Sequence, residues 1–101
     1  TTISDDNLPL SNIRELIDSI NKDRNLEVYH NEKDLIVNIN IAAMRLLEFF
    51  QWTDKNTELM SEMRKHIKEK LADVLIYSID LANIYDIDMT EMIMDKLAKD
   101  M

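Results

Sequence analysis

The chain contains no cysteine and no glycine, and it has one proline among 101 residues. The absence of cysteine excludes disulfide bonds, thiolate catalysis and cysteine-ligated zinc. The absence of glycine excludes the glycine-rich loops with which P-loop proteins and dinucleotide-binding proteins hold phosphate groups. Because the single proline is Pro9, almost nothing in residues 10–101 interrupts a helix.

Positive charge is also scarce, since 12 lysines and arginines stand against 20 acidic residues, for a net charge of −8. A chain with this balance lacks the cationic surface that binding to a nucleic acid backbone requires. No apolar run reaches the roughly 20 residues that span a bilayer, and the first residues show no signal-peptide pattern. We therefore expect a soluble, cytoplasmic protein that binds neither nucleic acid nor membrane.

The abundant residues are mostly good helix formers, namely leucine, isoleucine, methionine, alanine, glutamate and lysine. Apolar residues make up 46% of the chain, a share that excludes a disordered protein. A length of 101 residues corresponds to one domain. We predict an all-α fold, with residues 1–10 as a flexible N-terminal arm and residues 11–101 as one helical domain.

Hydrophobic spacing predicts four helices. They cover residues 11–23, 32–52 and 57–84, followed by a short last helix through Leu97. Ser11 and Asn31 stand where the N-caps of the first two helices are expected. Asp88 and Glu91 have the spacing of a capping box at the start of the last helix.

The helix over residues 32–52 is apolar on nearly every face, which predicts burial on all sides. One chain of 101 residues can hardly surround such a helix, so we expect a dimer or a tetramer. Its polar residues Asn38, Arg45 and Glu48 fall within one sector. A narrow polar sector on a buried helix indicates either a wet cavity or a junction between subunits.

The third helix carries two kinds of stripe. A polar stripe consists of Lys70, Asp73, Tyr77 and Asp80, which recur at helical spacing. The apolar residues of this helix that are expected to face a core are Leu71, Val74, Leu75, Ile79 and Leu81.

Three segments of the chain resemble the MazG-like, all-α nucleoside triphosphate pyrophosphohydrolases, most closely the small members that act on deoxynucleotides such as dCTP. The segments are RNLEVYHNEKDL, LLEFFQW and EKLADVLIYSIDLANIYDIDMTEMIMDKLAK. The resemblance covers about residues 12–100. It implies a four-helix architecture assembled as a dimer or tetramer. It also implies Mg²⁺-dependent hydrolysis of a nucleoside triphosphate to the monophosphate and pyrophosphate.

In that family Mg²⁺ is held by an E-x-x-E pair before FQW and an E-x-x-D pair at the start of LADV. The resemblance places the first pair on Ala42 and Arg45 and the second on Lys70 and Asp73. Only Asp73 retains a carboxylate, and two positions have become cations. Because Mg²⁺ requires hard oxygen ligands, we predict that this chain does not bind Mg²⁺ in the manner of the family.

The replacements fall on the ligands, while the residues that pack the helices keep the family pattern. Random decay should damage packing as readily as ligands. Targeted replacement fits this distribution better, either by engineering on an enzyme scaffold or by natural repurposing.

The resemblance also suggests nucleotide-binding residues. Trp52 is a candidate wall of a base pocket, with plain core packing of Phe49, Phe50 and Trp52 as the alternative. His30 could lie on the base side of that pocket. Phosphate-binding candidates are Lys33 and the two cations of the former metal site, Arg45 and Lys70, although ion pairs with neighbouring carboxylates are the alternative for those two. His66, within the charged run RKHIKEK, is expected to be exposed.

Three functions follow from these observations. The first is a pyrophosphohydrolase scaffold whose metal site is dismantled, inactive or nearly so, which binds deoxynucleotides weakly. The second is a still active Mg²⁺-dependent hydrolase with a rearranged site made of Glu48, Glu69, Asp73 and Asp80. The third is a helical interaction module, or a designed binder, that uses the fold only for its surface.

Overall fold

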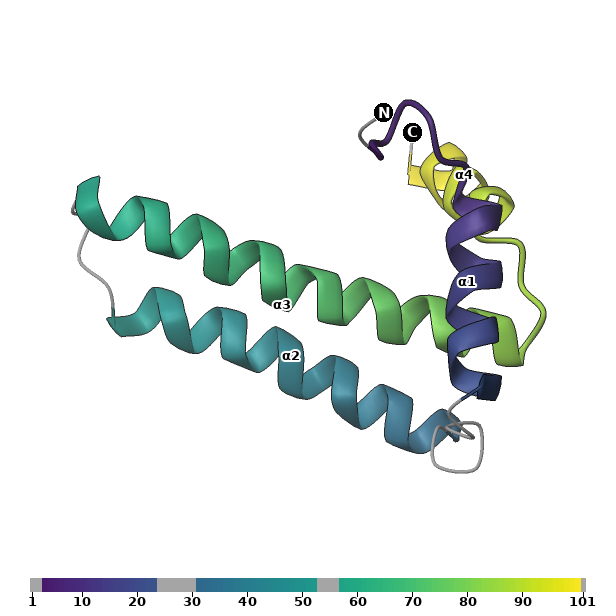
Figure 1. Ribbon diagram of the computed structural model, residues 1–101, viewed down its shortest axis with the longest axis horizontal. Helices are drawn as coiled ribbons and strands as arrows, with labels where there is room; N and C mark the ends of the chain where they lie inside the picture. Colours follow the sequence, from purple (N-terminus) through teal and green to yellow (C-terminus); the bar gives the residue numbers. More distant parts are fainter. Residues whose placement is uncertain (1–2, 24–30, 53–56, 101) are drawn as a thin grey trace.

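The computed structural model describes residues 3–23, 31–52 and 57–100, which form four α-helices and no strand (Figure 1). The helices are α1 (Leu10–Asp23), α2 (Glu32–Trp52), α3 (Thr57–Ile84) and α4 (Met89–Asp100). The predicted all-α class is confirmed, and the helix boundaries agree with the prediction to within one residue, except that α4 ends at Asp100, three residues beyond Leu97. No helix in the described ranges is both long enough and apolar enough to cross a membrane.

Side-chain caps explain where two of the helices begin. The backbone N–H of Asp34 donates to Asn31 Oδ1 at 2.9 Å, and that of Glu91 donates to Asp88 Oδ1 at 2.9 Å. Each bond satisfies one of the amide donors that a helix start leaves without an intrahelical acceptor. The predicted caps at the starts of α2 and α4 are therefore confirmed.

The predicted cap of the first helix is wrong. Helix α1 begins at Leu10, and the backbone N–H of Asn12 donates to the Pro9 carbonyl at 3.0 Å, so Ser11 lies inside the first turn. Proline suits a helix start because its ring fixes φ near the helical value and because the first amides need no intrahelical acceptor.

Helices α2 and α3 run antiparallel and pack along their length, and α1 crosses the C-terminal end of α3 (Figure 1). Apolar residues are buried at two places. Among the described side chains of α2, the buried apolar ones are Leu35 and Ala42. A second cluster joins α1, α3 and the start of α4; it consists of Ile79, Ala82 and Met89, with Leu10, Ile13 and Ile17 packed against it.

Much of the remaining apolar surface stays exposed within one chain. Leu71 and Leu75, which were expected to face a core, are 47% and 51% exposed within one chain. On α2 the side chains of Met44, Leu47 and Phe50 are also more than half exposed. Side chains between α2 and α3 are thus buried, while apolar side chains on the outer faces of the two helices stay exposed.

Candidate functional site

A contact between Phe49 and His66 fixes the level of α2 against α3. The two rings stack with centroids 4.3 Å apart and planes 20° apart. His66 Nε2 lies 3.4 Å from the carbonyl oxygen of Arg45. The prediction that His66 is simply exposed is therefore wrong, because its ring is half-buried between the two helices.

In this antiparallel register, four residues back along α2 and four forward along α3 reach Arg45 and Lys70, roughly one helical turn from the stack. A cavity of about 130 Å³ opens there between the helices. It is lined by Asn38, Ile41, Ala42 and Arg45 from α2 and by Lys70, Asp73 and Tyr77 from α3. The polar stripes of the two helices meet in this cavity. The four positions that the resemblance assigned to metal ligands, Ala42, Arg45, Lys70 and Asp73, line it together.

The side chain of Lys70 is 18% exposed, whereas that of Asp73 on the same lining is 40% exposed. Its Nζ lies 3.8 Å from Asp73 Oδ2 and 3.8 Å from Glu69 Oε1. These ion pairs are longer than a hydrogen bond, so the ammonium is attracted by both carboxylates without donating a proton to either. The ion pair with Asp73 is one that the sequence suggested.

Arg45 brings a second positive charge to the cavity. Within the described residues no carboxylate lies within ion-pairing distance of its guanidinium. Glu48, one turn further along α2, does not line the cavity. The lining therefore holds two cations and a single carboxylate, Asp73, and its net charge is positive.

This lining does not fit Mg²⁺. Mg²⁺ needs several hard oxygen ligands in near-octahedral geometry, whereas Ala42 offers no donor and the cations of Arg45 and Lys70 repel the ion. No three His, Cys, Asp or Glu side chains in the described part of the chain are grouped so that they could hold a metal. The hypothetical rearranged site therefore has no geometric support: Glu69 turns outward, with its side chain 73% exposed.

Three further residues were predicted for the site, and the structure describes the side chain of one of them, Lys33. His30 and the side chain of Trp52 lie outside the described part of the structure. Lys33 is exposed in the first turn of α2 and is not among the cavity residues. Conversely, Asn38 and Tyr77 line the cavity but were not predicted as site residues, although both belong to the polar stripes that the sequence contains.

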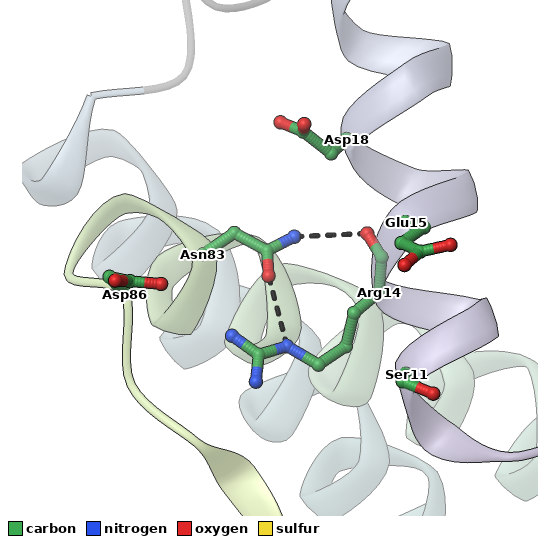
Figure 2. Close-up of a pocket in the computed structure, with 6 residues that line it drawn as sticks. All are labelled: Ser11, Arg14, Glu15, Asp18, Asn83 and Asp86. Atoms are coloured by element: carbon green, nitrogen blue, oxygen red, sulfur yellow. Dashed lines mark hydrogen bonds between the residues drawn. The ribbon is translucent and has the colours of Figure 1, made fainter.

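A larger cavity, of about 330 Å³, lies between α1 and the C-terminal end of α3 (Figure 2). Figure 2 shows Arg14 and Asn83 joined across it: Arg14 Nε donates to Asn83 Oδ1 at 3.0 Å, and Asn83 Nδ2 donates to the Arg14 carbonyl at 3.2 Å. These reciprocal bonds tie α1 to α3. The sequence gave no signal for this pair, because the two residues are far apart along the chain.

Asp86 completes the wall of that cavity and ends α3. It has a φ of 53°, and the next amide, that of Ile87, donates to the Ala82 carbonyl at 3.0 Å. This left-handed helix ending usually employs glycine, and aspartate is among the few other residues that tolerate it. The geometry accounts for Asp86 as a helix terminator in a chain without glycine.

Comparison with known proteins places this arrangement in a family. Residues 37–101 match the MazG-like family, so the chain belongs to the MazG-like family. The crystal structure of a pyrophosphatase from Archaeoglobus fulgidus DSM 4304 is similar, with a TM-score of 0.79 and 28% sequence identity. That likeness covers 98% of this chain and 94% of the archaeal chain. No curated protein sequence matches the chain significantly.

Proposed function

We propose that this chain is a nucleotide pyrophosphohydrolase scaffold that does not carry out Mg²⁺-dependent hydrolysis, or does so only very weakly. One observation carries the proposal: the cavity at the family's metal position is lined by Arg45, Lys70 and Ala42, with Asp73 as the single carboxylate. Membership of the MazG-like family and the likeness to a pyrophosphatase support the scaffold. The composition of the cavity supports the loss of metal.

The chemistry explains why the loss of the metal should abolish turnover. When bound, the metal stabilises charge on the phosphates and lowers the pKa of an attacking water. Arg45 and Lys70 can neutralise part of the phosphate charge, but a cation that ends in N–H donors cannot coordinate and activate water.

We expect no pyrophosphate release above the buffer rate when the chain is incubated with each of the four deoxynucleoside triphosphates and Mg²⁺ or Mn²⁺. An active MazG-like pyrophosphohydrolase under the same conditions is the positive control, and a chelator blank sets the background. Turnover that depends on Mg²⁺, rises in proportion to the chain and approaches the rate of the positive control would overturn the proposal in favour of a rearranged active site.

Self-association into a dimer or tetramer is part of the proposal. A compact monomer of this mass exposes about 5,900 Å², whereas this chain of 11.9 kDa exposes 8390 Å². Its radius of gyration is 16.0 Å, against about 13 Å for a compact domain of this length. The excess area is about three times the roughly 800 Å² that one partner buries in a standard interface. A large interface with one further copy, or interfaces with more than one, on the outer faces of α2 and α3 would bury this excess.

A further inference from the structure

We propose that the cavity between α2 and α3 is an anion site that binds a single phosphate group without metal. The proposal rests on the proposed function, because it takes the metal ligands as replaced, and it adds what occupies the site instead. The donors are Arg45 and Lys70, with the Asn38 amide and the Tyr77 hydroxyl on the same lining.

The first argument concerns hydrogen bonding. Lys70 is mostly buried, yet both of its carboxylate neighbours lie 3.8 Å away, beyond hydrogen-bond reach. An ammonium has three N–H donors, and no acceptor among the described residues takes any of them. An oxyanion in the cavity would supply acceptors at the place where the ammonium lies.

The second argument concerns charge. Arg45 has no carboxylate partner within the described residues, and its planar guanidinium suits two phosphate oxygens at once. Asp73 is the single negative charge on the lining and it attracts Lys70 from 3.8 Å. A bound anion therefore competes with Asp73 for the same ammonium. Asp73 would therefore weaken the binding of an anion in this cavity, whereas it would strengthen the binding of a metal ion.

The third argument concerns size. The cavity volume of 130 Å³ corresponds to roughly four water molecules at about 30 Å³ each. That volume accommodates one phosphate group and is below the roughly 300–1,000 Å³ of pockets that enclose a whole small-molecule ligand. The ligand class is therefore inorganic phosphate or the terminal phosphate of a nucleotide, and a nucleoside without phosphate is not bound at this cavity.

The test is calorimetric titration of the full chain, in chelator, with inorganic phosphate, dCMP and deoxycytidine. We expect phosphate and dCMP to bind with dissociation constants on the order of 1 mM, and deoxycytidine to bind at least tenfold more weakly. Tighter dCMP than phosphate would assign the site to a nucleotide, and equal affinities would assign it to free phosphate. The absence of binding by both at tens of millimolar would overturn the proposal.

Variants give the sharper result. Lys70→Met and Arg45→Met should each weaken phosphate binding about fivefold or more, because each removes a unit charge at contact distance. Asp73→Asn should tighten it about fivefold for the same reason. A gain of affinity cannot arise from misfolding, so this variant keeps the proposal open to refutation even if the cation variants unfold.

Lys96→Met is the matched control, since it removes an exposed lysine that pairs with Asp100 at 3.1 Å on α4. It should leave phosphate binding unchanged. An equal loss of phosphate affinity in Lys96→Met and Lys70→Met would show that overall charge causes the effect, and it would overturn the site. An Asp73→Asn variant that binds phosphate no better than the unmodified chain would also overturn it. These titrations contain no metal and no hydrolysable substrate. Absence of phosphate binding would therefore overturn the anion site alone, whereas a positive pyrophosphate-release assay would overturn the proposed function.

Discussion

Replacing Ala42, Arg45 and Lys70 together by glutamate should create a Mg²⁺ site that the unmodified chain lacks. The three side chains line one cavity with Asp73, so their carboxylates would converge with it on one ion. The change replaces two cations and one uncharged side chain by three anions. Mn²⁺ binding, followed by electron paramagnetic resonance, should show about one ion per variant chain and none for the unmodified chain.

The expected effect is large. Two unit charges about 4 Å apart interact by about 1 kcal/mol even in water-like surroundings, and the ion is divalent. Reversing or adding charge at three such positions should strengthen binding by roughly 100-fold or more. The triple variant Asn12→Glu, Lys22→Glu, Lys96→Glu alters net charge by the same amount at exposed positions and should bind no Mn²⁺ specifically. Equal binding by both triple variants would contradict the assignment of the four positions.

The double variant Met44→Glu, Leu47→Glu should convert the proposed dimer or tetramer into monomers. Both side chains are more than half exposed on α2 and lie one turn apart on the same face. This face is part of the proposed interface with another copy of the chain. In a symmetric dimer each new carboxylate would be buried and brought near its copy from the partner. We expect the dissociation constant to rise roughly a thousandfold or more, which sedimentation velocity at micromolar concentration would record as a shift to 11.9 kDa.

The control for this variant is Asn12→Glu, Ser19→Glu, which adds the same charge to exposed polar positions of α1. It should sediment like the unmodified chain. A monomeric unmodified chain at the same concentration, or an unchanged assembly in the Met44→Glu, Leu47→Glu variant, would contradict the proposed packing on this face of α2.

Local signals in the sequence were sufficient for the helices but not for what their faces contact. Asn31 and Asp88 cap their helices as predicted, because an N-cap bond spans only three residues. Leu71 and Leu75 were expected in a core and are exposed in one chain, because hydrophobic spacing indicates that a face is buried without indicating by which chain. Ser11 failed as a cap because the helix already begins at Leu10, directly after Pro9.

The site was predictable to the extent that motif spacing fixes it. The resemblance placed Ala42, Arg45, Lys70 and Asp73 at one site, and they line one cavity. The stack of Phe49 on His66 was not predicted, because it depends on the register of α2 against α3, which no local pattern encodes. The positions of Asn38 and Tyr77 on the cavity lining were not predicted either, because they depend on the same register.

The most direct test of the central claim, that cations have replaced the metal, is the effect of Mg²⁺ on nucleotide affinity. The ligand is a dCTP analogue with an imido group between the α and β phosphorus atoms, which separates binding from hydrolysis, and calorimetry measures its dissociation constant with and without Mg²⁺. A metal site requires Mg²⁺ to strengthen binding, whereas a cationic site competes with Mg²⁺ for the phosphates. We predict a dissociation constant on the order of 0.1–1 mM that Mg²⁺ leaves unchanged or raises. A constant that falls tenfold or more when Mg²⁺ is added would contradict the account.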